Sequence, residues 1–457
     1  MDVLNEAGEP SYDPDAPSPR VGAPVWATAT LDAERTGRLL RGAAMRTAIR
    51  NRLAPMLRDG TTLLHVRVQR VKVRPGASME LWLEARLRTG EAVTRRPVSL
   101  RWSASAAPPD RVPAGETDGD LSVVADGAEP FARWSPFDDQ FPNLARLLAP
   151  QVLSRALGVH DGSLDVGTVR YRPGERHVLR AATIDGGPGA ARWFAKLARP
   201  GEGRAAYEVA CAFAAAVDGD RTVVAVRPLA LVDDAAVYPA VRGRAVSTLV
   251  PTDDRAAPWL SHAGRALAVV HGSGFGDHPK MHTLASALVT TERAVRHLRA
   301  WLASGDARLD DLLGRLGVLV GCTPESAIVS LHGDCKLDHL HRRASVMHLI
   351  DIDNSGRGEA ALDIGNLLAD VWWWARSAPA ELVASCRQAV LDGYGNPPDA
   401  TRVALAEAIA LLRIAGRRPR IDRPGWMRET EAAVDSVERL VLEIERTLGI
   451  GNGRAGA

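Results

Sequence analysis

Two acidic side chains on either side of one short apolar segment constrain this chain more than any other feature. Asp334 stands in residues 331–340, LHGDCKLDHL, and Asp351 follows the apolar run 346–350. Only 17 positions separate the two acids, which fits a tight, hairpin-like unit that brings both carboxylates together. One carboxylate can then orient or deprotonate a hydroxyl group, while the other can hold Mg²⁺ on the phosphates of a nucleotide.

The composition fits a globular protein and excludes several other classes. Of the 457 residues, 46% are hydrophobic and 25% are charged, which excludes wholesale disorder. The net charge of +2 gives no general attraction to nucleic acid or anionic membranes, and no apolar run reaches the roughly 18 residues of a membrane span. Residues 1–17 lack the features of a secretory signal, and the four cysteines match no zinc or disulfide pattern. We expect a cytoplasmic protein without nucleic-acid or membrane partners.

Hydrophobic spacing divides the chain into four parts. Residues 1–30 read as a disordered leader and residues 31–130 as a small α+β domain with two strands around a turn at 74–76. A β-rich lobe over residues 150–243 precedes a helical lobe over residues 244–450, which carries the two acids. The expected fold class is therefore α+β.

Lysine is rare in this chain, which makes each lysine informative. Only Lys72, Lys196, Lys280 and Lys336 occur, and the other 53 basic residues are arginine. Because arginine serves almost everywhere a cation is needed, a retained lysine is a candidate for a site that requires a compact ammonium group rather than a planar guanidinium.

Three motifs in order resemble the aminoglycoside phosphotransferase and choline kinase-like family. That family has an HGDxxxxN catalytic loop, an IDxx metal segment and a DLA-like element, to which residues 332–339, 350–353 and 361–366 are similar. The resemblance covers roughly residues 160–450. It implies a two-lobed, protein-kinase-like fold that uses ATP or GTP and Mg²⁺ to phosphorylate a hydroxyl group of a small molecule. An aminoglycoside-like antibiotic, a sugar or an amino alcohol would be the acceptor.

The resemblance also implies roles for individual residues of the helical lobe. Asp334 resembles the catalytic base, and Lys336 stands where protein kinases use a lysine near the transferring phosphoryl group. Asp351 resembles the metal-binding acid. Asp363 and His332 would support the catalytic loop.

In the β-rich lobe, the resemblance assigns residues to nucleotide binding. Lys196 resembles the strand lysine that grips the α- and β-phosphates, with Glu208 as its preferred ion-pair partner and Glu202 as the alternative. The turn 172–176 stands where a phosphate-covering loop would lie. The connection between the lobes, whose backbone would pair with adenine, is expected at Tyr238, Pro239, Ala240 and Val241.

One position departs from the family pattern. The asparagine expected five residues after the catalytic aspartate is His339 in this chain. Imidazole is a softer nitrogen ligand that suits Mg²⁺ poorly. The loop could therefore use one Mg²⁺, accept Mn²⁺ with His339 as a ligand, or have lost phosphoryl transfer. Asp353 is expected to be a supporting or surface carboxylate.

Three alternative functions remain open on the sequence. The first is a kinase of Ser or Thr in a ribosomal peptide substrate, with the N-terminal domain as a docking module. The second is a sugar kinase that resembles maltokinases, although the catalytic loop of maltokinases differs from the sequence DCKLDH of this chain. The third, suggested by His339, is a nucleotide-binding pseudokinase that serves as a partner subunit.

Overall fold

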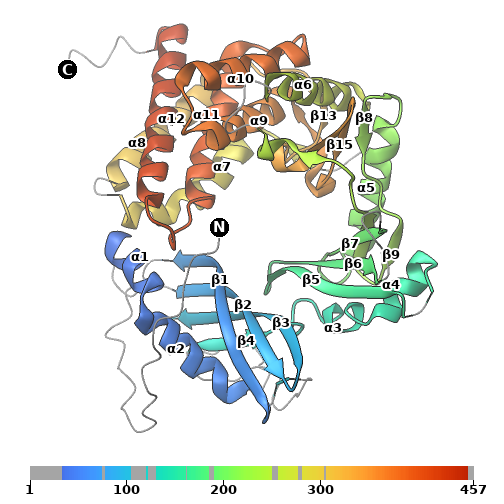
Figure 1. The fold of residues 1–457 in the computed structure, drawn as a ribbon. Helices are drawn as coiled ribbons and strands as arrows, with labels where there is room; N and C mark the ends of the chain where they lie inside the picture. The colour runs from blue at the N-terminus through green and yellow to red at the C-terminus, as the bar shows by residue number, and fades with distance from the viewer. Residues whose placement is uncertain are drawn as a thin grey trace.

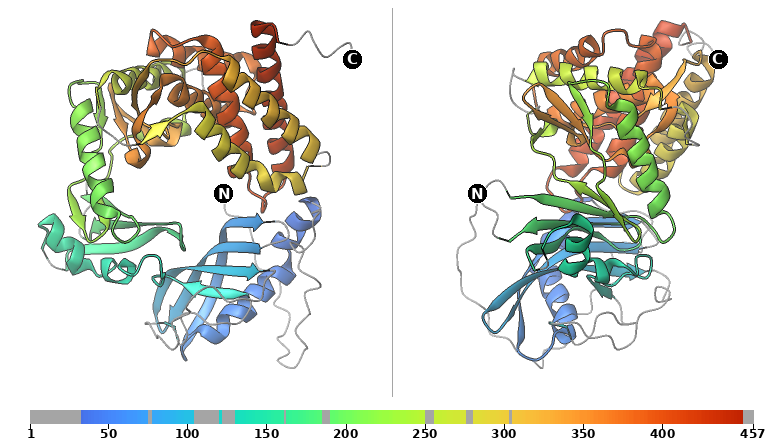
Figure 2. Two further views of the ribbon diagram at one scale, coloured as in Figure 1. Left: turned by 180° about the vertical axis from the view of Figure 1, so that it is seen from behind. Right: turned by 90° about the vertical axis from the view of Figure 1, so that its right-hand side faces the viewer.

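The computed structural model shows three bodies arranged around an open centre (Figure 1). An N-terminal sheet with two helices is followed by a second sheet and then by a helical lobe, which closes the ring against the first body (Figure 2). The expected leader, residues 1–30, lies outside the described part of the chain. The described residues are 33–74, 78–103, 120–121, 130–160, 162–184, 190–249, 256–275, 280–302 and 305–450.

The N-terminal sheet is antiparallel, with strand order β1-β2-β3-β4. Leu81, Leu83 and Leu87 alternate along β2 and fill the core beneath the helices, because successive side chains of a strand point to opposite faces. The elements are α1 (Ala33–Arg41), α2 (Ala43–Leu53), η2 (Ala54–Met56), β1 (Thr61–Arg74), β2 (Ser78–Thr89), β3 (Ala92–Ser103) and β4 (Phe131–Trp134).

This sheet corrects the expectation of two strands and of a domain end at residue 130. Among the described residues it has four strands, and the pairing of Val98 with Trp134 carries it beyond residue 130. β3 and β4 are far apart in sequence, so local spacing could not reveal that they pair.

The second sheet has the order β5-β6-β7-β10-β9 and forms the β-rich lobe. β5 and β6 meet at a tight turn in which Gly174 takes a φ of +69°, a conformation that favours glycine. The elements of this lobe are α3 (Leu144–Leu147), α4 (Pro150–Leu157), β5 (Leu164–Arg172), β6 (Arg176–Thr183), β7 (Arg192–Leu197), α5 (Gly203–Val217), β9 (Ala230–Val232) and β10 (Ala235–Pro239).

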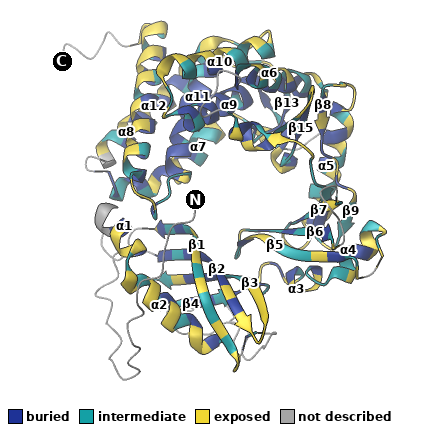
Figure 3. Cartoon of the chain, in the orientation of Figure 1, coloured by how far each residue is buried: buried dark blue, intermediate teal, exposed yellow. Residues whose placement is uncertain are grey.

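The helical lobe contains the largest core, in which α9 and α11 are the most buried helices (Figure 3). Leu367 and Leu411 are fully buried there. The helices are α6 (Ala256–Gly272), α7 (Leu284–Val295), η4 (Arg296–Ala300), α8 (Gly305–Cys322), α9 (Ala360–Ala375), α10 (Ala380–Tyr394), α11 (Ala400–Arg417) and α12 (Trp426–Leu448). No helix within the described ranges has both the length and the apolar character of a membrane span.

Two small sheets hold the segment that the sequence singled out. One has the order β11-β14-β15-β8 and the other β12-β16-β13. The connection from β13 to β14 carries Asp334, and Asp351 follows β15. The remaining elements are β8 (Val223–Ala225), β11 (Arg244–Ala245), η3 (Val246–Thr248), β12 (Met281–His282), β13 (Ile328–Leu331), η5 (Leu337–His339), β14 (Leu340–Arg343), β15 (Val346–Leu349), η6 (Ile352–Asn354) and β16 (Gly356–Glu359).

The N-terminal sheet contacts both other bodies. Its core cluster includes Trp301, Ile421 and Trp426 of the helical lobe. Towards the second sheet, Lys72 forms an ion pair with Glu175. These contacts close the ring and bring the edge strand β1 to the central cavity.

Candidate active site

The loop after β13 is shaped by Asp363, which projects from the first turn of α9. Its two carboxylate oxygens accept the backbone N–H groups of His332 and Gly333, at 2.7 and 3.0 Å. Burial alone would raise the pKa of Asp363, but a hydrogen bond and the charge of His271 act in the opposite direction, and the net pKa is lowered. Asp363 therefore stays ionised and fixes the start of the loop, which is the bracing position that the sequence suggested.

His332 is fully buried and ties the loop to the strand on the other side. Its Nε2 bonds the carbonyl oxygen of Ile350 at 3.1 Å, and the Asp334 N–H donates to its Nδ1 at 3.4 Å. This pattern requires the proton on Nε2 and leaves Nδ1 as an acceptor. Burial lowers the pKa of His332, which is consistent with a neutral ring in a supporting position.

Asp334 presents a partly exposed carboxylate to the cavity, and Lys336 lies beside it. The Lys336 Nζ is 2.8 Å from Asp334 Oδ2. Burial would raise the pKa of Asp334, but the charges of Lys336 and His339 hold it below the ordinary value. An ionised carboxylate with one oxygen on a lysine and its remaining acceptor capacity facing a cavity is suited to accept a hydrogen bond from a hydroxyl group.

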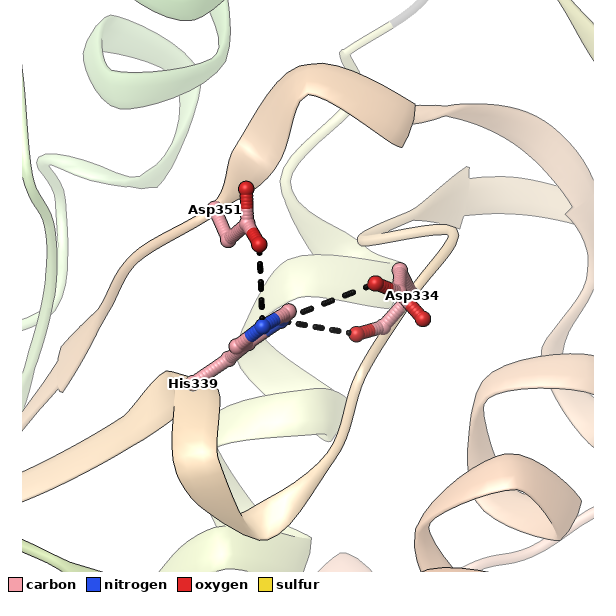
Figure 4. A group of neighbouring side chains, drawn as sticks. All are labelled: Asp334, His339 and Asp351. Atoms are coloured by element: carbon pink, nitrogen blue, oxygen red, sulfur yellow. Dashed lines mark hydrogen bonds and ion pairs between the residues drawn. The ribbon is translucent and has the colours of Figure 1, made fainter. Parts of the chain in front are cut away.

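His339 joins the two acids that the sequence paired (Figure 4). Its Nδ1 is 3.0 Å from the Asp334 carbonyl oxygen, and its Nε2 is 3.0 Å from Asp351 Oδ2. The Nδ1–H group donates to the carbonyl oxygen of Asp334. In a neutral ring, Nε2 then carries a lone pair, and it faces the carboxylate of Asp351. Two acceptors in contact require a proton or a cation between them. Within the described residues, Asp334, His339 and Asp351 each offer one ligand atom, and these atoms lie within 4.8 Å of one another.

This donor set fits a divalent cation. Two carboxylate groups suit Mg²⁺, while the imidazole nitrogen favours a softer ion such as Mn²⁺. Asp351 stands in the left-handed backbone region with a φ of +62°, which is uncommon for a residue other than glycine and is a feature of functional sites. Burial would raise the pKa of Asp351, but the hydrogen bond from His339 and the charges of Lys196 and Arg176 hold it far below the ordinary value.

Lys196 reaches across from β7 and forms ion pairs with Asp351 and Asp353. The expected pair with Glu208 is not formed, which corrects the sequence assignment. Glu208 projects from α5 into solvent, where it lies 3.9 Å from Arg204, one helical turn away. Position within a helix does not give the direction in which the helix turns a side chain, and here the direction is away from β7.

The connection at residues 238–241 lines the same cavity as Asp334 and Lys196. Tyr238 and Pro239 end strand β10. Pro239 has no N–H group, and the Ala240 N–H donates to the Arg192 carbonyl at 2.8 Å. Of these four residues, Val241 is the one whose N–H is not committed by the described backbone pairing.

Further side chains hold this site together. Arg176 belongs to the turn that was expected to cover the phosphates, and Asp353 was expected to be a supporting or surface carboxylate, whereas sequence reasoning missed Asn366 and Asp370. Arg176 donates to Asp351 at 2.5 Å, and Asp353 contacts both Arg176 and Lys196. On α9, Asn366 donates to the Cys335 carbonyl at 2.6 Å, and Asp370 accepts the Leu337 N–H at 2.6 Å. A signal was present: Asp363, Asn366 and Asp370 follow the i, i+3, i+7 spacing of one helix face within an otherwise apolar segment.

A cavity of about 1900 Å³ is lined by the central residues of this site, among them Asp334, Asp351 and Lys196. Asp334, Lys336, His339 and Asp351 lie on its helical-lobe side, and Lys196 lies on the second sheet. The cavity also reaches β1 of the N-terminal sheet and the end of α11. It exceeds the 300–1,000 Å³ of a typical ligand pocket, so it has room for more than one bound molecule.

Comparison with known proteins places the chain in context. The model of a family described as "Phosphotransferase enzyme family" matches residues 171–406, which is more than half of the chain. A search of curated proteins gave no match. The matched residues include Lys196, the segment 332–351 and Asp363.

The solved structures that match this chain share little sequence with it. A choline/ethanolamine kinase family protein from Mesorhizobium loti is 18% identical, with 62% of this chain and 92% of that chain covered and a TM-score of 0.42. A spectinomycin phosphotransferase in complex with ADP and spectinomycin is 12% identical, with 66% and 98% covered and a TM-score of 0.44. A choline kinase from Cryptosporidium parvum is 10% identical, with 64% and 93% covered and a TM-score of 0.45.

Proposed function

The chain belongs to the phosphotransferase enzyme family, and on this premise we propose that it transfers the γ-phosphoryl group of ATP or GTP to a hydroxyl group of a small molecule. One observation carries the proposal. The ionised Asp334 has Lys336 on one of its oxygens and shares a cavity with Lys196 and Arg176. In the same cavity, Asp334, His339 and Asp351 form the group that could hold a metal ion. Phosphoryl transfer needs little covalent chemistry from the protein beyond such positioning and charge neutralisation.

In this proposal Asp334 accepts a hydrogen bond from the acceptor hydroxyl group and can also accept its proton. Asp334 stays ionised because its pKa is lowered, so it is available as an acceptor at neutral pH. Lys336 is placed to balance negative charge on the phosphoryl group as it approaches the hydroxyl. Removing the carboxylate charge would leave the hydroxyl group without an orienting partner.

Lys196 and Arg176 would bind nucleotide phosphates, and the lobe connection would bind the base. Both cations are already held over Asp351, at the side of the cavity that is formed by the second sheet. Val241 offers an N–H group, and the carbonyl oxygens of the connection offer acceptors for an adenine edge.

A divalent cation would be held by Asp351 and His339, with Asp334 within reach of the same position. When bound, such an ion supplies positive charge that neutralises the phosphates of the nucleotide. The imidazole in this set makes Mn²⁺ a better match than it would be for an all-oxygen site, while the two carboxylates also suit Mg²⁺.

The test is a transfer assay with purified protein, ATP or GTP, and Mg²⁺ or Mn²⁺, against a panel of hydroxyl compounds. We expect Asp334→Asn to lower turnover by about 10²–10⁴-fold while nucleotide affinity stays within a few fold, because Asp334 acts on the hydroxyl group. Asp165→Asn, an exposed acid of β5 outside the cavity, is the matched control. Near wild-type turnover of Asp334→Asn would contradict the assignment.

A second candidate, a nucleotide-binding partner subunit without transfer activity, is favoured by one contact. His339 occupies the family's asparagine position and bonds both Asp334 and Asp351. Nucleotide binding by calorimetry with no turnover on any acceptor would support this candidate over the enzyme.

A further inference from the structure

The wall of the central cavity carries far more positive charge than the chain as a whole. The protein has a net charge of +2. Among the described residues that line the cavity, fifteen are Lys or Arg and four are Asp or Glu. The rest of the sequence therefore carries a net negative charge, and the positive excess is concentrated around the cavity.

Only part of this excess is explained by nucleotide and metal binding. Lys196, Arg176 and Lys336 already contact the acids of the catalytic site. A second group lies on β1, on β5, and on α11 together with Arg418, which directly follows that helix. We refer to it as the arginine cluster, and its members are Arg70, Arg170, Arg172, Arg413, Arg417 and Arg418.

The cluster members at the C-terminal end of α11 are tied to the loop that carries Asp334. Arg413 donates to Asn366 Oδ1 at 2.8 Å, and Asn366 in turn donates to the Cys335 carbonyl. Arg418 forms an ion pair with the buried Asp370, which accepts the Leu337 N–H. Two short hydrogen-bond chains therefore connect these arginines to the residues on either side of Lys336.

The N-terminal sheet completes the cluster from the opposite side. Arg70 Nη2 donates to the Arg417 carbonyl at 2.8 Å, which brings β1 against the end of α11. The Arg172 guanidinium lies 5.1 Å from the ring centre of Trp82, and that of Arg70 lies 5.7 Å from it. Stacking on an aromatic ring orients a guanidinium without neutralising its charge.

The cluster is electrostatically costly in the absence of negative charge. Burial and the charges of Arg170 and Arg70 together lower the pKa of Arg172 to about 10, against the opposing charge of Glu175. Burial also lowers the pKa of Arg413, with further contributions from Arg417 and Arg418. Like charges that crowd a partly desolvated wall repel one another, and an anion between them would reverse that cost.

We propose that the acceptor is an anionic small molecule, a hydroxyl compound that carries carboxylate or phosphate groups and is bound by the arginine cluster beside Asp334. This inference rests on the proposed function and specifies its substrate class. Guanidinium groups bind carboxylate and phosphate oxygens in pairs of parallel hydrogen bonds, so several arginines fix the orientation of such an acceptor. A polycationic acceptor would meet like charge in the same place.

A binding experiment tests the substrate class without requiring turnover. The full chain is saturated with a non-hydrolysable ATP analogue and Mg²⁺, so that the nucleotide site is filled, and citrate, glycerol 3-phosphate and kanamycin are titrated separately by calorimetry. We expect citrate or glycerol 3-phosphate to bind once per chain, and kanamycin not to bind. The preferred anion distinguishes a carboxylate acceptor from a phosphate acceptor.

Substitutions in the arginine cluster show where the anion binds. Arg172→Gln and Arg417→Gln should each weaken anion binding by about 10-fold or more, as expected for the loss of a charge-assisted hydrogen bond. Arg86→Gln, on the exposed side of β2 and outside the cavity, should leave it unchanged. The melting temperature of each variant in the nucleotide complex shows that it is folded.

The outcomes separate this inference from the proposed function. Anion binding that depends on Arg172 and Arg417 supports the inference even if no compound is phosphorylated, in which case only the transfer proposal fails. Binding of kanamycin in preference to the anions, or anion binding unaffected by both variants, overturns it. Turnover of neutral polyols, with no gain for their carboxylate or phosphate forms, also overturns it while leaving the transferase intact. Tight binding of an acidic peptide, with no binding of small anions, would replace the small-molecule class by a peptide.

Discussion

Lysine scarcity is an informative residue-level feature of this chain. Three of the four lysines line the central cavity, and each contacts a carboxylate: Lys72 pairs with Glu175, Lys196 with Asp351 and Lys336 with Asp334. In a chain that otherwise uses arginine, this distribution supports the idea that these positions require a compact ammonium group.

Substituting Lys196 tests that requirement. Because the Lys196 ammonium fits between two acids, we expect Lys196→Arg to weaken nucleotide binding nearly as much as Lys196→Ala, by about 10-fold or more. Calorimetric titration with ATP measures the effect. Lys280→Arg, outside the cavity, serves as the control. Full nucleotide affinity in Lys196→Arg would refute the argument from lysine scarcity.

If His339 is a metal ligand, its imidazole nitrogen should set the preference between Mn²⁺ and Mg²⁺. Replacing its nitrogen by an amide oxygen should shift the ratio of kcat/KM values with Mn²⁺ and Mg²⁺ several-fold towards Mg²⁺ in His339→Asn. His341→Asn alters a nearby cavity residue that is not part of the ligand group, and should leave the ratio unchanged. An unchanged ratio in His339→Asn would mean that Asp351 holds the metal without it.

Gly333 is required by two independent constraints. Its φ is +76°, and an added Cβ would lie 1.9 Å from the Asn354 carbonyl oxygen. We expect Gly333→Ala to lower the free energy of unfolding by more than about 2 kcal/mol, since strain and collision add. Gly158→Ala, at a φ of +64° with nothing within 4 Å, should cost only about 1 kcal/mol. If urea unfolding shows that both variants lose the same free energy of unfolding, the collision of the added Cβ with Asn354 does not contribute.

At the scale of elements, the hydrogen bonds of Asp138 join the segment after β4 to the β5–β6 turn. Its carboxylate accepts the Gly174 N–H at 2.7 Å and lies 2.6 Å from His177 Nε2, in a fully buried pair. This contact fixes the position of the turn that carries Arg176, whose guanidinium reaches Asp351. A buried pair that does not itself line the cavity thus helps to place a residue that does.

The pH dependence of that contact can be predicted. Burial would raise the pKa of Asp138, but the hydrogen bonds from His177 and Gly174 lower it. A carboxylate whose pKa is lowered on folding stabilises the folded state. This contribution is complete above about pH 4 and is lost as the pH falls through the pKa of the folded state. Asp138→Asn should therefore be less stable than wild type by about 1.5–3 kcal/mol at pH 7, and the difference should shrink towards pH 2. Urea unfolding at several pH values measures it, and a constant difference would contradict the linkage.

Elements with strong local patterns could be predicted from the sequence, and elements set by distant contacts could not. The spacing of apolar residues locates the helical lobe, and the motif around Asp334 locates the loop that joins β13 to β14 and lines the cavity. The pairing of Val98 with Trp134 depends on a long connection, and the direction of Glu208 depends on how α5 packs. The roles of Arg176 and Asn366 emerge only when β6 and α9 meet the loop.

At the scale of the whole molecule, the N-terminal sheet is a third wall of the cavity. Its core extends into the helical lobe through Trp301, Ile421 and Trp426, and its edge strand supplies Arg70 to the arginine cluster. No pattern within residues 31–130 indicates this docking, because the apolar side chains involved lie more than 150 positions away. The family model matches residues 171–406 and does not reach this sheet, so the contribution of the sheet to acceptor binding is a proposal.

The docking of this sheet can be weakened at Trp426, which lines the cavity and also belongs to the core cluster of the sheet. Trp426 and Trp301 meet edge to face with ring centres 5.2 Å apart, within a buried cluster. Trp426→Ala should remove about 3–5 kcal/mol of packing and increase hydrogen exchange in β1. Citrate affinity should then fall about 10-fold because Arg70 loses its position, whereas nucleotide affinity should stay within a few fold, since Lys196 lies on the second sheet. Trp259→Ala, a partly buried tryptophan of α6 outside the cavity, controls for the loss of an aromatic side chain. If β1 exchange and citrate affinity are unchanged in Trp426→Ala, the N-terminal sheet is held to the helical lobe by other contacts, and its edge is not what shapes the acceptor side of the cavity.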